Sequence, residues 1–375
     1  ERSLKARTSN GDFISAIVFA VVAATLIHTY VMQPFTIPTT SLEKTLLVGD
    51  FLLVSKFHYG ARTPTTAVSF PMVHDTLPKV GIKSYLSWPQ LPYFRLPGFQ
   101  DIKRNDIVVF SWPVDTVRFF FDRSNIHVYK PLDKKSNYVK RAVGIAGDTL
   151  EIRDGYVYIN GKKSQLPDRA RLQFSYSLET NGQPLFNSSF LKRYEITDGV
   201  AQIAQNRFQI HALTEEAAQQ LTTHPAVANV SKLLLPSDYK DPSIFPNNGE
   251  YNWNRDHMGP VYIPKAGDVI ALNKRNFDMY QYAINQYEHQ QLEWKDDQAY
   301  LNGQVADSYT FSQNYYWMMG DNRHNSEDSR FWGFVPFDHV VGKPVFVWMS
   351  IEGITQGISN WKPRWDRFFI TVGGS

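Results

Sequence analysis

The segment from Phe13 to Met32 constrains this chain most strongly, because its 20 residues include no Asp, Glu, Lys or Arg. As an α-helix it would be about 30 Å long, which is enough to cross the hydrocarbon core of a bilayer. Arg2, Lys5 and Arg7 precede the segment, and positive charges favour the cytoplasmic side of a membrane. We therefore predict one transmembrane helix, with everything after it on the outer side.

A cleaved signal peptide is the main alternative to a span. The apolar run is long for the hydrophobic part of a signal peptide, and no clear Ala-x-Ala motif ends it. A buried helix of a soluble protein is a weaker alternative. The sequence begins with Glu1 rather than Met, which is compatible with a native N-terminus further upstream.

Composition excludes several functional classes. The chain contains no cysteine, which excludes disulfides, a cysteine nucleophile and thiolate metal sites. Its net charge is only +3, and it has no basic block or basic aromatic stripe, so we expect no nucleic-acid partner. With 43% hydrophobic residues, the 375-residue chain is able to form a sizeable core.

After the span the pattern predicts short strands separated by turns. Two Gly-containing pairs, Asp154-Gly155 and Asn160-Gly161, are typical of tight hairpin turns. We therefore predict a mainly β fold, with an antiparallel β-sheet core preceded by one transmembrane helix. The predicted strands cover residues 51–57, 107–112, 138–143, 149–153 and 156–159.

A polar stretch interrupts this β pattern, and it carries one predicted helix from Thr214 to Thr223, in which Thr214 would cap the start and Glu215 and Glu216 suit the first turn. We interpret the stretch as an insertion, after which the β core resumes. The predicted division is a cytoplasmic stub and span at 1–33, a first part of the core at 34–161, an inserted subdomain at 162–298, a second part of the core at 299–350 and a tail at 351–375.

A proline- and aromatic-rich stretch at 86–99 reads in two ways. Trp and Tyr favour the membrane interface, so the stretch is a candidate membrane-docking surface. An ordinary packed loop would have the same composition.

Ser41 is a candidate nucleophile, because it lies only nine residues beyond Met32. At about 3.3 Å per extended residue it would stay within about 30 Å of the membrane. A serine needs a base to take its proton, yet no histidine lies in a recognisable serine-protease motif such as Gly-x-Ser-x-Gly. The alternative interpretation is structural, because Thr40 and Glu43 are spaced as a helix capping box.

Lys140 is the candidate base. Burial among apolar groups lowers the pKa of a lysine from about 10.4 by as much as 3–5 units. In the predicted strand, alternation places Tyr138, Lys140 and Ala142 on one face. The alternative is a solvated strand lysine.

The segment 319–333 is dense in turn formers and opposite charges. It reads either as a solvated loop or as a rigid loop that supports a catalytic site. In the second case, Asp328 with Arg330, or Asp321 with Arg323, would lock it.

In combination these features resemble the type I signal (leader) peptidases, which are membrane-anchored serine proteases with a Ser–Lys dyad. Residues 60–100 and 162–296 lie outside the resemblance, which covers under half of the chain. Four blocks carry it, in the order of the family: Ile37-Pro-Thr-Thr-Ser-Leu42, Gly49-Asp-Phe-Leu-Leu-Val54, Tyr138-Val-Lys-Arg-Ala-Val-Gly-Ile-Ala-Gly-Asp148, and Gly320-Asp-Asn-Arg-His-Asn-Ser-Glu-Asp-Ser-Arg330 continuing to Pro336.

The resemblance implies a role for each matched position. Ser41 would be the nucleophile and Lys140 the general base. The hydroxyl of Thr39 and the backbone N–H of Ser41 would form the oxyanion hole. Ser326 would hydrogen-bond and orient Lys140. The remaining matched residues would brace the loop or wall the pocket, namely Asp328, Arg330 and Tyr138.

Four positions depart from the family pattern. Members often carry Ser, Met, Pro and Asp where this chain has Thr39, Leu42, Ala146 and His324. A Thr hydroxyl still donates a hydrogen bond, and Leu is similar in volume to Met. His324 changes the local charge of the loop without touching the proposed dyad.

The resemblance implies a serine endopeptidase that removes signal peptides from exported preproteins, with small residues at positions −1 and −3 before the cut. It implies no metal or other cofactor, and the lipid bilayer as a partner. The catalytic domain would lie on the outer or periplasmic side of the inner (plasma) membrane. Two alternatives stay open: a self-cleaving Ser–Lys protease, and a catalytically inactive, membrane-tethered β scaffold that binds peptides or envelope partners.

Overall fold

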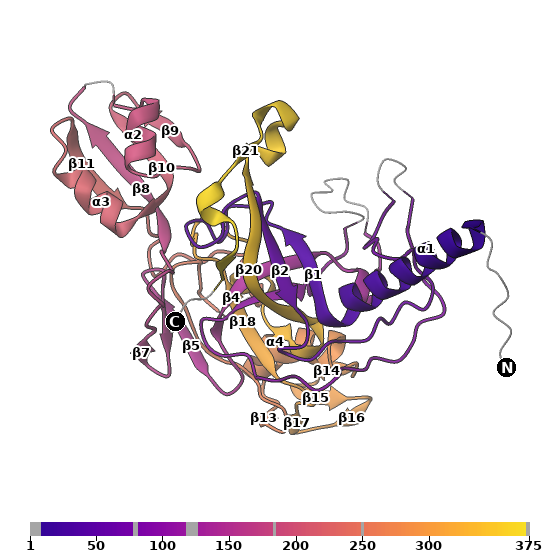
Figure 1. Cartoon of the computed structure of the whole chain (residues 1–375). Coiled ribbons are helices and arrows are strands. Elements are labelled where there is room, and N and C mark those ends of the chain that lie inside the picture. Colours follow the sequence, from indigo (N-terminus) through magenta and orange to yellow (C-terminus); the bar gives the residue numbers. More distant parts are fainter. Residues whose placement is uncertain (1–8, 78–81, 118–126, 183–184, 249–250, 373–375) are drawn as a thin grey trace, which may run out of the picture.

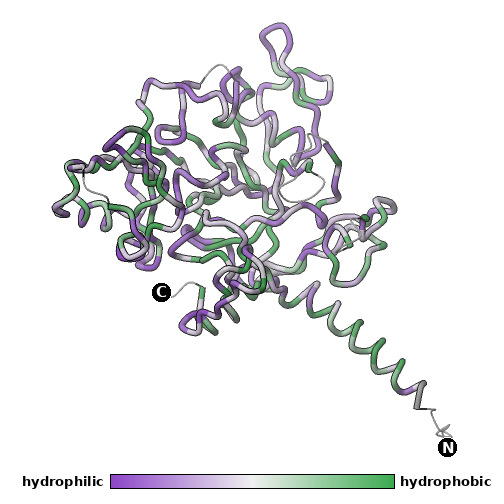
Figure 2. Tube along the Cα trace, turned by 90° about the horizontal axis from the view of Figure 1, so that it is seen from above, coloured by the Kyte–Doolittle hydropathy of each residue, from purple (hydrophilic) through white to green (hydrophobic). Residues whose placement is uncertain are grey.

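The structure is a computed structural model that describes residues 9–77, 82–117, 127–182, 185–248, 251–372 of the chain (Figure 1). Helix α1 (Ser9–Leu26) opens the described part and continues as one π-helical segment, η1 (Ile27–Val31). Among the described residues, this helix alone is long and apolar enough to cross a membrane, from Gly11 to Val31. It projects away from the body of the molecule (Figure 2). Its large apolar side chains, among them Phe13, Phe19 and Leu26, are exposed. The helix therefore coincides with the predicted span.

The central sheet confirms the predicted mainly β fold. Its strands follow the spatial order β1-β2-β20-β3-β4-β18-β19, and each neighbouring pair is antiparallel. These strands are β1 (Met32–Thr36), β2 (Asp50–Ser55), β3 (Ile107–Ser111), β4 (Asn137–Gly144), β18 (Tyr315–Met319), β19 (Val335–Pro336) and β20 (Val340–Glu352). β1 follows η1 directly, so the sheet begins where the apolar helix ends (Figure 1).

A second sheet extends the core with the strand order β12-β5-β6-β7. Its strands are β5 (Thr149–Arg153), β6 (Tyr156–Ile159), β7 (Lys162–Lys163) and β12 (Met258–Tyr262). The predicted turns join β5 to β6 and β6 to β7. Asn160 and Gly161 have φ of 52° and 80°, the left-handed conformations that a type I′ hairpin turn requires.

Helix α4 (Lys274–Gln286) packs in the same hydrophobic cluster as this sheet, through Phe277 and Ile284. Two small sheets lie around it. They are formed by β13 (Val269–Ala271) with β17 (Ser308–Thr310), and by β14 (Leu292–Lys295), β15 (Gln298–Leu301) and β16 (Gln304–Val305).

Residues 173–232, which we call the inserted unit, have a hydrophobic cluster of their own that includes Leu178, Ile210 and Leu221. The unit lies to one side of the main body (Figure 1). It contains α2 (Ser188–Arg193), α3 (Glu215–Thr222) and an antiparallel sheet of order β11-β8-β10-β9, with β8 (Gln173–Thr180), β9 (Val200–Ala204), β10 (Arg207–Thr214) and β11 (Val227–Lys232). The side chain of Thr214 caps α3 by accepting from the Ala217 N–H at 3.2 Å, as the sequence predicts.

The predicted domain boundaries stay a prediction, but the packing divides the polar stretch in two. Its first part has the separate core of the inserted unit. In its second part, β12 pairs with β5, and Ile284 shares a cluster with Leu150 and Trp317 of the main body. We propose that the independent part of the insertion is closer to residues 173–232 than to 162–298.

Residues 61–77 and 82–96, which we call the aromatic loop, fold back on one another as an irregular hairpin. Isolated antiparallel bridges join Arg62 to Arg95 and Thr66 to Gln90. Many of its large apolar side chains are exposed, including Trp88, and Phe99 follows just after it. The C-terminal segment adds β21 (Lys362–Pro363) and β22 (Ile370–Thr371) to β20. The remaining short helical turns are η2 (Leu132–Lys134), α5 (Ser329–Trp332), η3 (Phe337–His339), η4 (Ile354–Gln356), η5 (Ile358–Asn360) and η6 (Trp365–Arg367).

Candidate active site

Ser41 lies in the turn between β1 and β2, and its exposed fraction is 8%. A helical turn follows it, because the Leu46 N–H donates to the Leu42 carbonyl at 2.8 Å. Both leucines are buried in a cluster with Val109 and Val347 of the central sheet, which fixes the turn against that sheet. The Thr39 hydroxyl lies 3.5 Å from the Ser41 hydroxyl.

The capping-box interpretation of this turn is half right. The turn exists, with a bond from the Glu43 N–H to the Thr40 carbonyl at 2.9 Å. The Thr40 hydroxyl, however, donates to the Asp198 carboxylate at 3.2 Å and caps nothing. Its side chain is therefore engaged by a residue of the inserted unit.

Lys140 lies in β4 opposite Val108 of β3, and only 3% of it is exposed. Burial lowers the pKa of its amine to about 8, although the nearby carboxylates of Asp328 and Glu327 oppose the shift. The amine lies 5.7 Å from the centre of the Tyr138 ring. A lysine in this environment is partly neutral near pH 8, as a general base must be.

The segment 319–333 is a rigid loop. The Arg330 guanidinium binds both oxygens of Asp328 at 2.8 Å, and both residues are fully buried. Burial is the largest single influence on the pKa of Asp328 and raises it. The charge and hydrogen bonds of Arg330, together with Lys140 and the Gly320 N–H, outweigh burial and leave this pKa lowered. Asp328 also accepts from the Gly320 N–H at 3.1 Å, so the ion pair ties the two ends of the loop together.

The alternative prediction, an ion pair between Asp321 and Arg323, is wrong. Asp321 instead pairs with Arg141 of β4 at 2.6 Å. Arg323 donates to the backbone carbonyls of Gly155 and Gly320 at 2.6 and 3.2 Å. Burial of both guanidinium groups makes such specific partners necessary. Asp321 and Gly155 are supplied to Arg141 and Arg323 from distant parts of the chain, whereas Gly320 is close to Arg323 in the sequence.

Ser326 is buried, and its hydroxyl has no hydrogen-bond partner among the described residues. The predicted hydrogen bond from Ser326 to Lys140 is therefore not formed in this structure, and its role stays a prediction. Likewise, no hydrogen bond joins Lys140 to Ser41 in the part of the chain that the structure describes. The unsatisfied hydroxyl is itself informative, because buried polar groups seldom lack a partner.

Gly320 brings the two serines close together. A Cβ added at Gly320 would lie 2.3 Å from the Ser326 hydroxyl and 2.6 Å from the Ser41 carbonyl oxygen. Only a glycine leaves room for this approach of the 319–333 loop to the Ser41 turn.

The residues of the proposed dyad open into one cavity of about 930 Å³. Its lining comes from the β1 end, β4, the aromatic loop and the 319–333 loop, and includes Thr39, Ser41, Tyr138, Lys140 and Ser326. Asp328 and Arg330 are not in the lining but lie behind it in the same loop. The Tyr138 hydroxyl donates to Glu327 at 3.3 Å, so this ring is held at the wall of the cavity.

Among the described residues, no group of His, Asp and Glu side chains could hold a metal ion.

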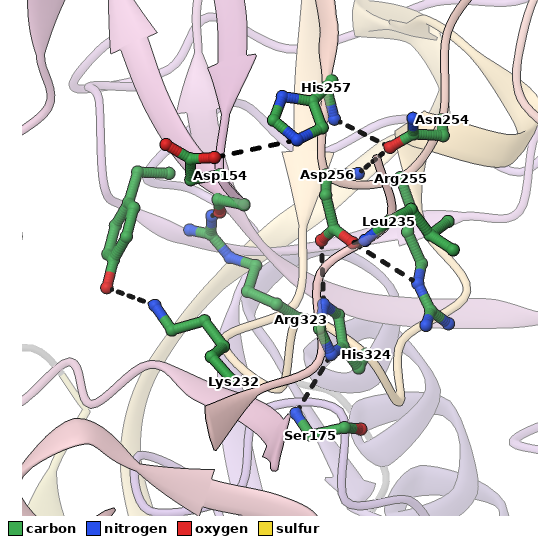
Figure 3. A network of polar contacts seen from close by, with 12 residues as sticks. Asp154, Ser175, Lys232, Leu235, Asn254, Arg255, Asp256, His257, Arg323 and His324 are labelled. Atoms are coloured by element: carbon green, nitrogen blue, oxygen red, sulfur yellow. Dashed lines mark hydrogen bonds and ion pairs between the residues drawn. The ribbon is translucent and has the colours of Figure 1, made fainter. Parts of the chain in front are cut away.

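His324 connects the 319–333 loop to the inserted unit (Figure 3). Its Nδ1 accepts from the Ser175 N–H at 3.0 Å, and its Nε2 lies 2.8 Å from the Asp256 carboxylate. Since Nδ1 is the acceptor, the ring is the neutral tautomer that donates from Nε2. Burial lowers the pKa of His324 despite the nearby Asp256. The departure from the family pattern therefore adds a neutral hydrogen-bonded link rather than a charge.

Comparison with known proteins assigns the family. The model of the family described as signal peptidase, peptidase S26, matches residues 11–224 and 261–349. This match includes residues 60–100 and much of the inserted unit, which the four sequence blocks do not cover. The chain therefore belongs to the signal peptidase family, peptidase S26.

Curated relatives cover most of the chain. Signal peptidase I of Haemophilus influenzae is 25% identical over 371 residues, which are 96% of this chain and 75% of the relative. Signal peptidase I of Helicobacter pylori is 24% identical over 371 residues, at 96% and 93% coverage. Signal peptidase I of Buchnera aphidicola subsp. Schizaphis graminum is 27% identical over 330 residues, at 87% and 71% coverage.

Sequence reasoning missed three residues that shape the site, namely Gly320, Asn322 and Asp198. Gly320 and Asn322 lie inside the fourth sequence block, so their place in the motif was known from the sequence. The residues that they contact were not predictable from it. Asp198 is separated from Thr40 by 158 residues, and no local pattern marks it.

Gly320→Ala should disturb the site. The added methyl group would clash with the Ser41 carbonyl, which belongs to the backbone and has no rotamer to change. We expect a loss of about 1–3 kcal/mol in the free energy of unfolding and slower labelling of Ser41 by a serine-directed phosphonylating probe. Urea unfolding and labelling kinetics measure the two effects.

Gly147→Ala is the matched control. Unlike Gly320, Gly147 has a positive φ of 89°, which strains an alanine backbone, but an added Cβ there would meet no atom within 4 Å. Labelling of Ser41 should be unchanged in this variant. Equal labelling rates for Gly320→Ala and wild type would contradict the proposed close approach.

Lys140→Met should stabilise the protein near neutral pH. Below pH 8 the folded state carries a buried protonated amine, whose penalty corresponds to about 3 kcal/mol for a pKa lowered from 10.5 to about 8. Between pH 8 and 10.5 the unfolded state binds more protons, so the penalty shrinks with rising pH and is gone above 10.5. Urea unfolding of both proteins at pH 7 and pH 10 tests this, and an equal difference at both pH values would refute it.

Proposed function

We propose that this chain is a membrane-bound serine endopeptidase that removes signal peptides from exported preproteins, with Ser41 as nucleophile and Lys140 as general base. The observation that carries the proposal is that Ser41 and the buried Lys140 line one cavity. Membership of the signal peptidase family, and relatives that are named signal peptidase I, support the substrate class.

The proposed reaction is acyl transfer in two steps. Neutral Lys140 takes the proton of the Ser41 hydroxyl, whose oxygen attacks the scissile carbonyl carbon. The lysine then protonates the leaving amine, and a water molecule hydrolyses the acyl-enzyme with Lys140 again as the base. The lowered pKa of Lys140 supports this role, because about half of a base with a pKa near 8 is neutral at pH 8.

Two donors would stabilise the oxyanion, namely the Thr39 hydroxyl and the Ser41 N–H. The distance of 3.5 Å between the Thr39 and Ser41 hydroxyls supports this assignment. Loss of one such donor costs about 2.7–4 kcal/mol in other enzymes. The unsatisfied Ser326 hydroxyl is a suitable partner for the amine of Lys140, since hydrogen bonds of a catalytic site often tighten only when substrate binds.

The substrate would bind as an extended strand. β1 pairs with β2 alone in the described part of the chain, and β18 pairs with β4 only from Arg141 onward. The outer edge of β1 and the Asn137–Lys140 edge of β4 therefore keep backbone groups available, and both strands line the cavity. A peptide that adds to such an edge presents alternate side chains to it, which fits the expected small residues at −1 and −3.

We propose that α1 anchors the protein in the inner (plasma) membrane and holds the site at its outer surface. The stretch 86–99, most of which belongs to the aromatic loop, would rest on the same surface. This is supported by a shared cavity beside the end of the span, where Thr25 and His28 lie with Phe70 and Leu91. Signal peptides are apolar segments, so an enzyme fixed at the bilayer surface meets them at the right depth.

Ser41→Ala and Lys140→Ala should each abolish cleavage of a model preprotein by the detergent-solubilised chain. The wild-type kcat/KM should rise with pH and level off above an apparent pKa of about 8, because the base must lose its proton. Both are measured by gel-based cleavage assays at pH 6–10.

Lys134→Ala serves as the control, because Lys134 is another buried lysine and does not line the cavity. It should keep the wild-type pH profile. Normal cleavage by Ser41→Ala or Lys140→Ala would end the proposal. Absence of both cleavage and Ser41 labelling in the folded wild type would favour the inactive scaffold.

Trp88→Gln tests membrane docking in proteoliposomes. Brominated lipids quench tryptophans that lie in the bilayer, so total quenching should fall when Trp88 is removed. Trp365→Gln is the control, since Trp365 is similarly exposed (73% against 81%) but lies in the C-terminal segment. If Trp88→Gln leaves the quenching as it is in wild type, the aromatic loop does not dock.

A further inference from the structure

We propose that the inserted unit positions the nucleophile through the carboxylate of Asp198. This inference rests on the proposed function of Ser41 and deepens it. Asp198 lies between α2 and β9 and does not line the cavity. It would therefore act as a positioning residue and not as a catalytic one.

One oxygen of Asp198 receives hydrogen bonds from two loops of the site. The Thr40 hydroxyl donates to it at 3.2 Å, the Asn322 side-chain amide at 2.6 Å and the Asn325 side-chain amide at 2.8 Å. Asn325 also donates to the Thr40 hydroxyl at 3.2 Å. Hydrogen bonds to a carboxylate are shorter and stronger than those between neutral groups, so Asp198 ties the Ser41 turn to the 319–333 loop.

Asn322 links Asp198 to the backbone around Ser41 through two further hydrogen bonds. Its backbone N–H donates to the Ser41 carbonyl at 3.1 Å, and its side-chain amide donates to the Thr40 carbonyl at 3.4 Å. The Thr40 carbonyl and the Ser41 N–H belong to one planar peptide unit and point in opposite directions. A bond that holds the carbonyl therefore also aims the Ser41 N–H, which is a proposed oxyanion donor.

The inserted unit is itself held firmly where it meets the 319–333 loop and the Ser41 turn. The first residue of β8, Gln173, exchanges backbone hydrogen bonds with Asp321 and Arg323 at 3.0 and 2.9 Å. The Ser175 N–H donates to one ring nitrogen of His324, and the other ring nitrogen hydrogen-bonds to Asp256 (Figure 3). A separate bond runs from Lys44 to the Glu195 carbonyl at 2.8 Å. Because the unit is anchored at several points, Asp198 has a fixed position relative to Ser41.

The experiment compares Asp198→Ala, Asp198→Asn and wild type as full-length, detergent-solubilised chains. We expect kcat for a model preprotein to fall by about tenfold to a hundredfold in Asp198→Ala while KM changes less than about twofold, because positioning affects the reacting atoms and not peptide binding. Labelling of Ser41 by a serine-directed phosphonylating probe should slow by a similar factor. Asp198→Asn keeps one acceptor oxygen and should lie in between.

Glu195→Gln is the matched control. Glu195 lies three residues before Asp198. Its exposed side chain forms an ion pair at 3.3 Å with Lys44, without contact to Thr40 or Asn322. Its kcat should equal that of wild type. Asn325→Ala removes a partner of Asp198 without changing the inserted unit. Its effect on kcat should not add to that of Asp198→Ala, because both variants break the same hydrogen-bond network around Asp198. If Asp198→Ala does not fold, Asp198→Asn and Asn325→Ala decide the question.

Two outcomes would overturn the inference: wild-type kcat and labelling in a folded Asp198→Ala protein, or a loss confined to KM, which would indicate peptide recognition instead. Ser41→Ala in the same assay separates this failure from that of the proposed function. An inactive Ser41→Ala beside a fully active Asp198→Ala leaves the proposed function intact. An active Ser41→Ala removes the proposed function itself.

Discussion

The free-energy cost of burying a protonated amine is the constraint on which the candidate site depends. Lys140 is 3% exposed, and burial is the main cause of its lowered pKa. The carboxylates of Asp328 and Glu327 would restore the charge if they faced the amine without compensation. Arg330 limits this effect, because it occupies both oxygens of Asp328 and adds a positive charge of its own. The ion pair thus braces the loop and at the same time keeps the lysine poised to lose its proton.

The site is assembled by strand pairing between segments that are far apart in the sequence. Ser41 follows β1 at one edge of the central sheet, Lys140 lies in β4, and the 319–333 loop follows β18. The antiparallel pairing of β4 with β18 brings Arg141 opposite Met319, which places the loop beside the lysine. Gly320 then allows the loop to approach the Ser41 turn. The inserted unit completes the arrangement from outside, through Asp198 and the His324 link to Asp256.

Much of the fold followed from local patterns, because each has a local physical cause. The uncharged run of α1, the Asn160-Gly161 turn and the Thr214 cap depend on residues that are close in sequence. Ion pairs were less predictable. Asp328 with Arg330 was predicted because the two residues share the start of one short helix. Asp321, in the loop after β18, instead pairs with Arg141 of β4 and not with nearby Arg323.

The sequence by itself determined a segment long and apolar enough to cross a membrane and the strand periodicity, since composition and spacing are local properties. The family resemblance of its motifs singled out Ser41 and Lys140 as the proposed reactive side chains. Only the tertiary structure decided that Lys140 is buried, that the Ser326 hydroxyl lacks a partner, and that Asp198 reaches Thr40. These features depend on which surfaces exclude water from one another, and that exclusion is set by contacts between residues more than a hundred positions apart.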